Sequence, residues 1–178
     1  MVIKIMKTED MPQSLRNEIL AVCNAAFGAP FNELFSFIPD GSIHAIGYDE
    51  NHVLICHAVA TERVFRTNDL PEMKAAYIDA VATLPEYQKK GCASQVMRAL
   101  TLCVGEDFDI AGLSTYIAPW YAKLGWKVWK GPLFLFRDSE IIATPDEKGT
   151  VMYYSLPRTP NLDVTQSLTA SWRPGGGW

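Results

Sequence analysis

A loop with two lysines and a glycine joins a buried apolar stretch to an amphipathic one. Residues 74–84 are rich in Ala, Val, Ile and Tyr and predict a central strand, and residues 91–104 carry apolar side chains at helical spacing. The residues at their junction, 88–93, are Gln-Lys-Lys-Gly-Cys-Ala. The free N–H groups and the dipole of a helix N-terminus attract anions, and Gly91 lets the backbone approach a pyrophosphate closely. The segment therefore predicts an anion site, with a plain loop that carries two solvated lysines as the alternative.

This loop does not match the two common nucleotide-binding loops. The Gly-Lys-Ser/Thr end of a Walker A loop is missing, and so is the three-glycine spacing of a Rossmann fingerprint. The whole chain has 16 basic and 20 acidic residues, which gives a net charge of −4. That balance argues against a nucleic-acid partner, because such a partner requires a basic footprint, and it is compatible with a cationic small molecule.

Length and composition predict one domain over residues 1–178. The hydrophobic share of 48% and the charged share of 20% exclude a disordered chain. The apolar runs are too short for a membrane span, and the N-terminal stretch lacks the pattern of a signal peptide. The four cysteines lie far apart among apolar neighbours, which predicts reduced thiols in a cytoplasmic protein and no metal site.

Strand and helix patterns alternate in the middle of the chain and are flanked by hairpins. Helices are expected over residues 12–26, 91–104 and 118–124, with one helical turn within residues 31–37. Strands are expected over residues 2–6, 42–48, 52–66, 74–84, 108–113, 126–136, 151–156 and 163–172. This order predicts an α/β fold with a mixed sheet.

The loop at residues 88–93 also resembles a known signature. It is similar to the Gln/Arg-x-x-Gly-x-Gly/Ala motif of the GNAT superfamily of N-acetyltransferases. Residues 120–126 (Trp-Tyr-Ala-Lys-Leu-Gly-Trp) resemble the second motif of that superfamily, and the pair in this order is more specific than either motif alone. The resemblance implies a single N-acetyltransferase domain with a mixed, mostly antiparallel twisted sheet, flanking helices and splayed central strands.

Further segments resemble the aminoglycoside 2'-N-acetyltransferases, from Phe27 to the last residue. They include residues 27–31 (Phe-Gly-Ala-Pro-Phe), 76–82 (Ala-Tyr-Ile-Asp-Ala-Val-Ala) and the tail 171–178 (Ser-Trp-Arg-Pro-Gly-Gly-Gly-Trp). This resemblance implies direct transfer of an acetyl group from acetyl-CoA to the 2' amine of an aminoglycoside-type antibiotic, with CoA as product and resistance as the outcome. It also implies a homodimer.

The resemblance further implies which residues would hold acetyl-CoA. The strand backbone at Val81, Ala82 and Thr83 would pair with the pantetheine arm. The pyrophosphate would lie on Gln88, Lys89, Lys90, Gly91, Cys92, Ala93 and Ser94.

Three residues would carry the chemistry if the resemblance holds. The N–H of Val81 would polarise the thioester carbonyl, and Tyr121 would be the general acid that protonates the departing thiolate. Asp79 stands where the family has a glutamate that accepts the amine proton, usually through water. The alternatives are a surface tyrosine at position 121 and a structural carboxylate at position 79.

The acceptor would contact a mostly acidic set of positions, and carboxylates suit ammonium groups. The set is Glu33, Asp79, Ala80, Ser114, Asp146, Glu147 and the carboxylate of Trp178. The family has aspartates where this chain has Pro30 and Gly176, and the segment between Ser114 and Tyr121 is about two residues shorter. Fewer acids predict a less cationic substrate, such as kasugamycin, in preference to polycationic drugs.

Two other functions stay open at this point. The chain would act on a different amine, such as a polyamine, an amino acid or a peptide N-terminus, if only the fold were shared with the family. It would be a non-catalytic acyl-CoA-binding module if it lacked the chemical groups, although the presence of Tyr121 and Asp79 argues against that function.

Overall fold

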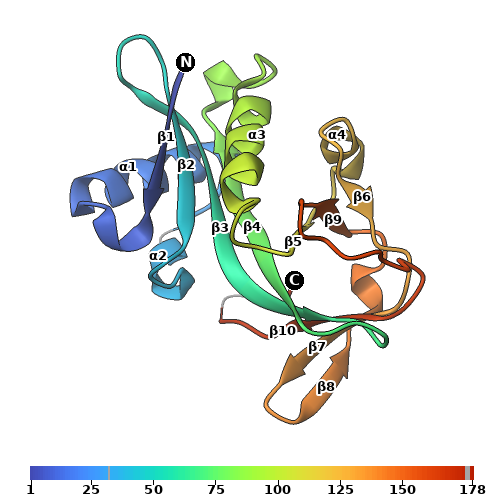
Figure 1. The fold of residues 1–178 in the computed structure, drawn as a ribbon. Coiled ribbons are helices and arrows are strands. Elements are labelled where there is room, and N and C mark those ends of the chain that lie inside the picture. The colour runs from blue at the N-terminus through green and yellow to red at the C-terminus, as the bar shows by residue number, and fades with distance from the viewer. Residues whose placement is uncertain (32, 175–176) are drawn as a thin grey trace. The chain divides into compact units, whose positions relative to one another are not determined.

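The computed structural model describes residues 1–31, 33–174 and 177–178. The chain divides into a first unit, Met1–Thr61 with Ile78–Val104, and a second unit, Glu62–Tyr77 with Gly105–Trp178. Two long strands, β3 (Leu54–Arg66) and β4 (Met73–Thr83), contribute residues to both units (Figure 1).

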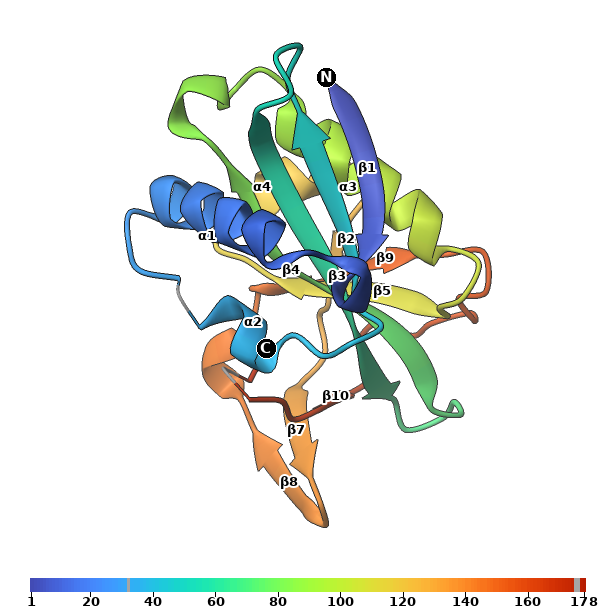
Figure 2. The ribbon, with the colours of Figure 1, turned by 90° about the vertical axis from the view of Figure 1, so that its left-hand side faces the viewer.

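The first unit contains a small antiparallel sheet with helices on both faces. Strand β2 pairs with β1 on one side and with β3 on the other, and Figures 1 and 2 show α1 and α3 on opposite faces of these strands. Neighbouring β2 residues point to opposite faces, because Ile46 packs into the cluster around α1 while a Cβ on Gly47 would lie 3.3 Å from Val96 of α3. The elements, besides parts of β3 and β4, are β1 (Val2–Lys7), η1 (Thr8–Asp10), α1 (Gln13–Phe27), α2 (Leu34–Phe37), β2 (Ile43–Tyr48), η2 (Pro85–Tyr87) and α3 (Cys92–Val104).

Helix α1 follows from its apolar spacing and its ends. Pro12 directly precedes the first turn, and Gly28 at φ 65° adopts the left-handed conformation that ends the helix. The buried face consists of Leu15, Ile19, Val22 and Cys23, which recur at helical spacing. This face packs against residues of α2, β2, β3 and β4 in one apolar cluster.

The strands of the second unit, together with the shared β3 and β4, follow the order β6-β9-β5-β4-β3-β10-β7-β8 in the sheet. Strand β4 runs parallel to β5 through Ala75–Tyr77, and β10 runs parallel to β7, while the pairs β5–β9, β6–β9, β3–β10 and β7–β8 are antiparallel. The new elements are β5 (Ile110–Ser114), α4 (Ala118–Ala122), β6 (Lys127–Val128), β7 (Leu133–Arg137), β8 (Glu140–Ala143), η3 (Pro145–Glu147), β9 (Val151–Ser155) and β10 (Leu168–Ser171). The expected mixed, mostly antiparallel α/β fold with flanking helices is confirmed.

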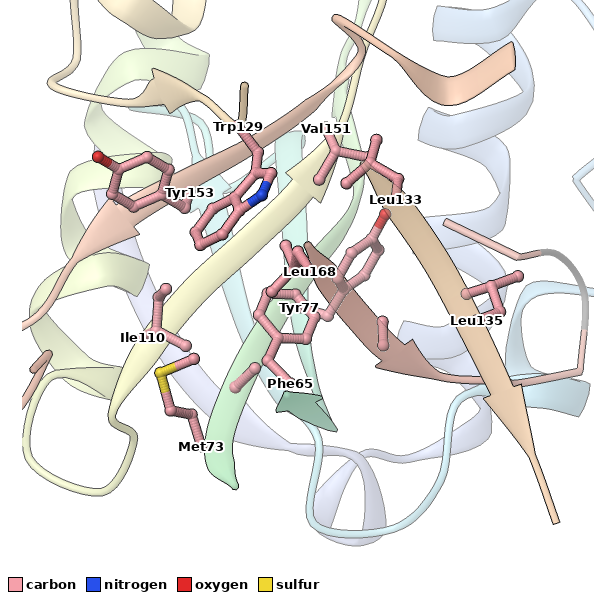
Figure 3. Close-up of a cluster of buried hydrophobic side chains, with 12 residues drawn as sticks. Phe65, Met73, Tyr77, Ile110, Trp129, Leu133, Leu135, Val151, Tyr153 and Leu168 are labelled. Atoms are coloured by element: carbon pink, nitrogen blue, oxygen red, sulfur yellow. The ribbon is translucent and has the colours of Figure 1, made fainter. Parts of the chain in front are cut away.

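Large aromatic and aliphatic side chains fill the core of the second unit. Figure 3 shows Trp129, Tyr153, Tyr77 and Phe65 among aliphatic residues of five strands. Phe65 lies so close to the backbone of β5 that a Cβ on Gly112 would be 2.5 Å from its ring. The small residue at position 112 is therefore required by packing.

The late strands differ from the expected boundaries in three places. The strand expected over 126–136 is two strands, β6 and β7, because the N–H groups of Lys130 and Gly131 both donate to the carbonyl of Val164 instead of to a sheet partner. The strand expected over 163–172 begins only at Leu168, because the carboxylate of Asp163 binds the backbone N–H and hydroxyl of Thr165 in a turn. Strand β8 was not expected.

Candidate functional site

Strand β4 contains a backbone irregularity at the positions singled out for chemistry. Ala80 has φ 48°, in the left-handed region that residues with a Cβ seldom adopt. The run of buried residues 75–78 ends there, because Asp79, Ala80 and Val81 are all half-buried. Asp79 and the N–H of Val81 flank this left-handed residue, and an irregularity of this kind re-aims side chains.

The predicted anion loop follows the end of β4. Lys89 at φ 61° and Gly91 at φ 83° are both left-handed, and α3 begins directly afterwards at Cys92. A Cβ on Gly91 would meet no other atom within 4 Å, so the glycine is required by its backbone angle and not by crowding. The side-chain amide of Gln88 donates to the carbonyl of Thr83 over 3.2 Å and so ties the loop back to the strand.

The surface of this loop suits a diphosphate. Gln88, Lys89, Lys90 and Gly91 are exposed, and the first turn of a 13-residue helix presents N–H groups that have no partner within the helix. Cys92 is buried, and Ala93 and Ser94 are half-buried. The donor set therefore consists of backbone N–H groups and two ammonium groups, which is the chemistry that a pyrophosphate requires.

Tyr121 lies in an aromatic group of the second unit. It is 7% exposed, and its ring meets Trp120 edge-on at 4.7 Å and Trp126 edge-on at 6.1 Å between centroids. Helix α4 begins at a proline-containing turn, and the carbonyl of Tyr121 accepts hydrogen bonds from the N–H groups of Leu124 and Trp126. The tyrosine is thus buried in aromatic packing and is not a surface residue of the helix.

Two predicted acceptor residues of the second unit, Ser114 and Glu147, meet Thr150 at the end of β5. The hydroxyl of Thr150 lies 2.7 Å from Oε2 of Glu147, and the hydroxyl of Ser114 lies 3.3 Å from the same oxygen and 3.1 Å from that of Thr150. Asp146 precedes Glu147 and is exposed. The cluster brings the Glu147 carboxylate together with two hydroxyls, which suits an ammonium group.

Two other predicted acceptor residues belong to different units. The indole N–H of Trp178 donates to the hydroxyl of Thr144 over 2.9 Å, and its ring lies 6.0 Å from that of Phe65. Glu33 is exposed in the first unit, directly before α2. Gly176 lies outside the described residues.

Two buried histidines of the first unit contact each other, and one of them contacts the irregular part of β4. His57 lies within hydrogen-bond distance of the carbonyl of Ala80, at 3.1 Å, and of His44, at 2.9 Å. Burial lowers the pKa of His57 to about 3, which makes it a poor proton acceptor at neutral pH.

The described part of the chain offers neither a metal site nor a membrane-spanning helix. Residues 1–31, 33–174 and 177–178 contain no group of three or more His, Cys, Asp or Glu side chains arranged to hold a metal ion. Within the same ranges, none of the helices has the length and apolar character needed to cross a membrane.

Comparisons with known proteins agree on one family. A family model described as an acetyltransferase (GNAT) domain matches residues 4–129. An aminoglycoside 2'-N-acetyltransferase from Mycolicibacterium fortuitum is 27% identical, over 98% of this chain and 91% of its own length.

Solved structures share the fold at low identity. The GNAT family N-acetyltransferase YhbS from Escherichia coli, in complex with CoA, matches with a TM-score of 0.68 at 12% identity, over 94% of this chain and 88% of that one. Eis1 from Mycobacterium abscessus matches with a TM-score of 0.63 at 13% identity, over 75% of this chain, although the match spans only 33% of Eis1.

Proposed function

Because the chain belongs to the GNAT acetyltransferase family, we propose that it transfers the acetyl group of acetyl-CoA to the 2' amine of an aminoglycoside-type antibiotic and so confers resistance. One observation carries the proposal: the left-handed Ala80 in β4 is followed, in one continuous segment, by the left-handed Lys89 and Gly91 at the start of α3. The relative from M. fortuitum, which this chain matches over nearly its whole length, supports the choice of acceptor.

The residues of the first unit fit acetyl-CoA, which supplies an activated acyl group as a thioester when it is bound. The backbone of Val81, Ala82 and Thr83 pairs with the pantetheine arm. The N–H groups of residues 91–94, with the ammonium groups of Lys89 and Lys90, hold the pyrophosphate. The N–H of Val81 donates to the thioester carbonyl and stabilises the oxyanion that develops there.

The protein moves protons in the proposed reaction. Asp79 accepts the proton that the substrate ammonium must lose before it can attack, through a water molecule because aspartate is one methylene shorter than glutamate. The amine nitrogen then bonds to the acetyl carbon while the carbon–sulfur bond breaks. Tyr121 donates its hydroxyl proton to the departing thiolate, and CoA leaves as the thiol. The nitrogen loses its second proton as the amide forms, and that proton restores the tyrosine hydroxyl.

The acceptor site of this proposal uses Ala80 beside Asp79, the Ser114–Glu147 group with Asp146, Glu33, and the carboxylate of Trp178. Pro30 replaces an aspartate of the family, and position 176 is a glycine. Each missing charge-assisted contact weakens binding of a polycationic drug by about 1.5–3 kcal/mol. We therefore expect kasugamycin to be a better substrate than gentamicin- or kanamycin-type drugs.

The experiment is thiol release from acetyl-CoA against a panel of aminoglycosides that includes kasugamycin, followed by mass spectrometry and NMR to locate the acetyl group. The expected result is acetylation of a 2' amine. Turnover of a polyamine or a peptide N-terminus without turnover of any antibiotic would point to another acceptor on the same fold. CoA binding without thiol release for any amine would make the chain a binding module.

The proposal also includes a homodimer in the cytoplasm, where acetyl-CoA is available. Equilibrium sedimentation at several concentrations tests the dimer directly. A single species of 19.8 kDa, the mass of one chain, would contradict it.

A further inference from the structure

A chain of hydrogen-bonding groups runs through the first unit to the left-handed residue of β4. The hydroxyl of Thr8 lies 2.9 Å from Nε2 of His44, and Nδ1 of His44 lies 2.9 Å from Nε2 of His57. Nδ1 of His57 lies 3.1 Å from the carbonyl oxygen of Ala80. Both imidazoles are fully buried, at 0% exposure, so no solvent completes their hydrogen bonds.

The carbonyl of Ala80, at the end of this series of hydrogen bonds, determines where the hydrogens on the two neutral imidazoles lie. A carbonyl oxygen only accepts, so Nδ1 of His57 carries a hydrogen, and Nε2 of the neutral ring accepts. Nδ1 of His44 must then carry a hydrogen, and its Nε2 accepts from the hydroxyl of Thr8. With both rings neutral, the only arrangement that satisfies all three contacts has both hydrogens on Nδ1.

The surroundings keep the two rings neutral. Burial lowers the pKa of His44 to about 4 and that of His57 to about 3, and the positive charge of Arg16 further disfavours a proton on His44. Arg16 is fixed beside this group, because its guanidinium donates to the carbonyl of Thr8 over 2.8 Å and lies 5.4 Å from the ring of Phe35, which stacks on His44. A second proton on His57 would also oppose its Nε2–H to the Nδ1–H of His44.

We propose that His57 is a positioning residue for acetyl transfer, and that its bond to the Ala80 carbonyl, ordered through His44 and Thr8, holds Ala80 in the left-handed conformation. An alanine in that conformation is strained and persists only where its surroundings determine it. The direction of the Asp79 side chain and of the Val81 N–H depends on the same backbone angles, since these residues flank Ala80. The catalytic meaning of the bond rests on the proposed function, whereas the hydrogen-bond order and the conformation of Ala80 do not.

The proton positions are tested by long-range proton–nitrogen NMR correlations of the imidazoles at pH 7. The chain has three histidines, and His52→Asn identifies the signals of the exposed one. We expect the Nδ1–H tautomer for both His44 and His57. An Nε2–H tautomer at either ring, or a charged ring at pH 7, would overturn the proposed order.

The positioning role is tested with two variants of His57. The amide nitrogen of His57→Asn takes the place of Nδ1 and keeps the donor to Ala80, whereas His57→Leu removes it. We expect His57→Leu to shift the backbone chemical shifts of Ala80 away from left-handed values and His57→Asn to keep them. Unchanged shifts in a folded His57→Leu protein would refute the positioning role, whether or not the protein is an acetyltransferase.

Turnover provides the second readout. We expect kcat for acetyl transfer to fall about 10- to 100-fold in His57→Leu, with the KM for acetyl-CoA changed less than about 3-fold, and to stay within about 3-fold of the original in His57→Asn. Adding Ala80→Gly to His57→Leu should restore part of the loss, because glycine adopts the left-handed conformation without strain. Equal losses in the Leu and Asn variants, or losses that simply follow the unfolding midpoint, would contradict the proposal.

Absence of thiol release in the unmodified protein would instead refute the proposed function, and the NMR results would still decide the inference.

Discussion

The hydroxyl of Tyr87 donates a 2.7 Å hydrogen bond to Oδ2 of Asp49. The other oxygen of this carboxylate accepts from the N–H groups of Asn51 and Val53, at 2.9 Å each, and so closes the turn between β2 and β3. This bond lowers the pKa of Asp49 and raises that of Tyr87. One carboxylate therefore ties a hairpin turn to η2, which leads directly into the anion loop.

Loss of the Asp49–Tyr87 bond should weaken CoA binding, because the loop would lose an anchor just before its left-handed residues. We expect Tyr87→Phe and Asp49→Ala each to raise the dissociation constant for CoA about 3- to 10-fold in calorimetry, with little change in kcat. The double variant should be no worse than the more affected single variant, since both remove the same bond. Glu50→Gln, in the same turn, is the control. Unaltered CoA affinity in Tyr87→Phe would show that the loop does not need this anchor.

Tyr121→Phe isolates the proposed general acid. The substitution keeps the ring that packs against Trp120 and Trp126 and removes only the hydroxyl. We expect kcat to fall about 10- to 1000-fold, the range for loss of a general acid, while CoA affinity stays near its original value. Tyr116→Phe is the matched control, because that side chain is 93% exposed and outside the core. Full turnover in Tyr121→Phe would remove this residue from the mechanism.

Glu147→Gln tests the acidic group at the end of β5. The amide keeps the size of the side chain and one oxygen for the hydroxyls of Ser114 and Thr150, but it no longer attracts an ammonium group. We expect the KM for the amine acceptor to rise about 10-fold while the KM for acetyl-CoA changes little. The exposed Glu140 of β8 offers a control in Glu140→Gln. An equal rise of both KM values would argue that Glu147 serves the structure and not the acceptor.

Local sequence rules predicted those parts of the fold that depend on neighbouring residues. Apolar spacing and Gly28 defined α1, and the small and basic residues at 88–93 marked the loop before α3. Strand β8 was missed because its turn depends on the left-handed Asp138, a conformation that aspartate adopts only in a minority of cases.

The histidine contacts depended on strand register, which no local pattern reveals. His44 lies opposite Val59 and His57 lies opposite Ile46, so the two rings are diagonal neighbours across β2 and β3. A shift between Gly47 and Tyr48 contributes to this register. Alternation could place each histidine on a strand, but the meeting of the two rings and their contact with Ala80 required the pairing itself.

The buried histidines should also make the fold sensitive to mild acid. The ordinary pKa of both is 6.5, and the folded values are about 4 for His44 and about 3 for His57. Because the folded values are lower, the unfolded chain takes up protons that the folded chain excludes, so this contribution to the free energy of unfolding is complete above pH 6.5 and is lost as the pH falls toward 4. We expect each histidine to reduce the free energy of unfolding by about 1 kcal/mol between pH 7 and pH 5.5, measured by urea unfolding.

His57→Asn should make this dependence on pH about half as steep, since it leaves only His44 to take up a proton on unfolding. Calorimetry in two buffers of different ionisation enthalpy gives an independent count, because unfolding at pH 5.5 should bind close to two protons from these groups in the original protein and about one in the variant. The prediction would be wrong if the two proteins showed the same pH dependence of the free energy of unfolding and the same proton uptake. That result would mean that His57 takes up no proton on unfolding in this range.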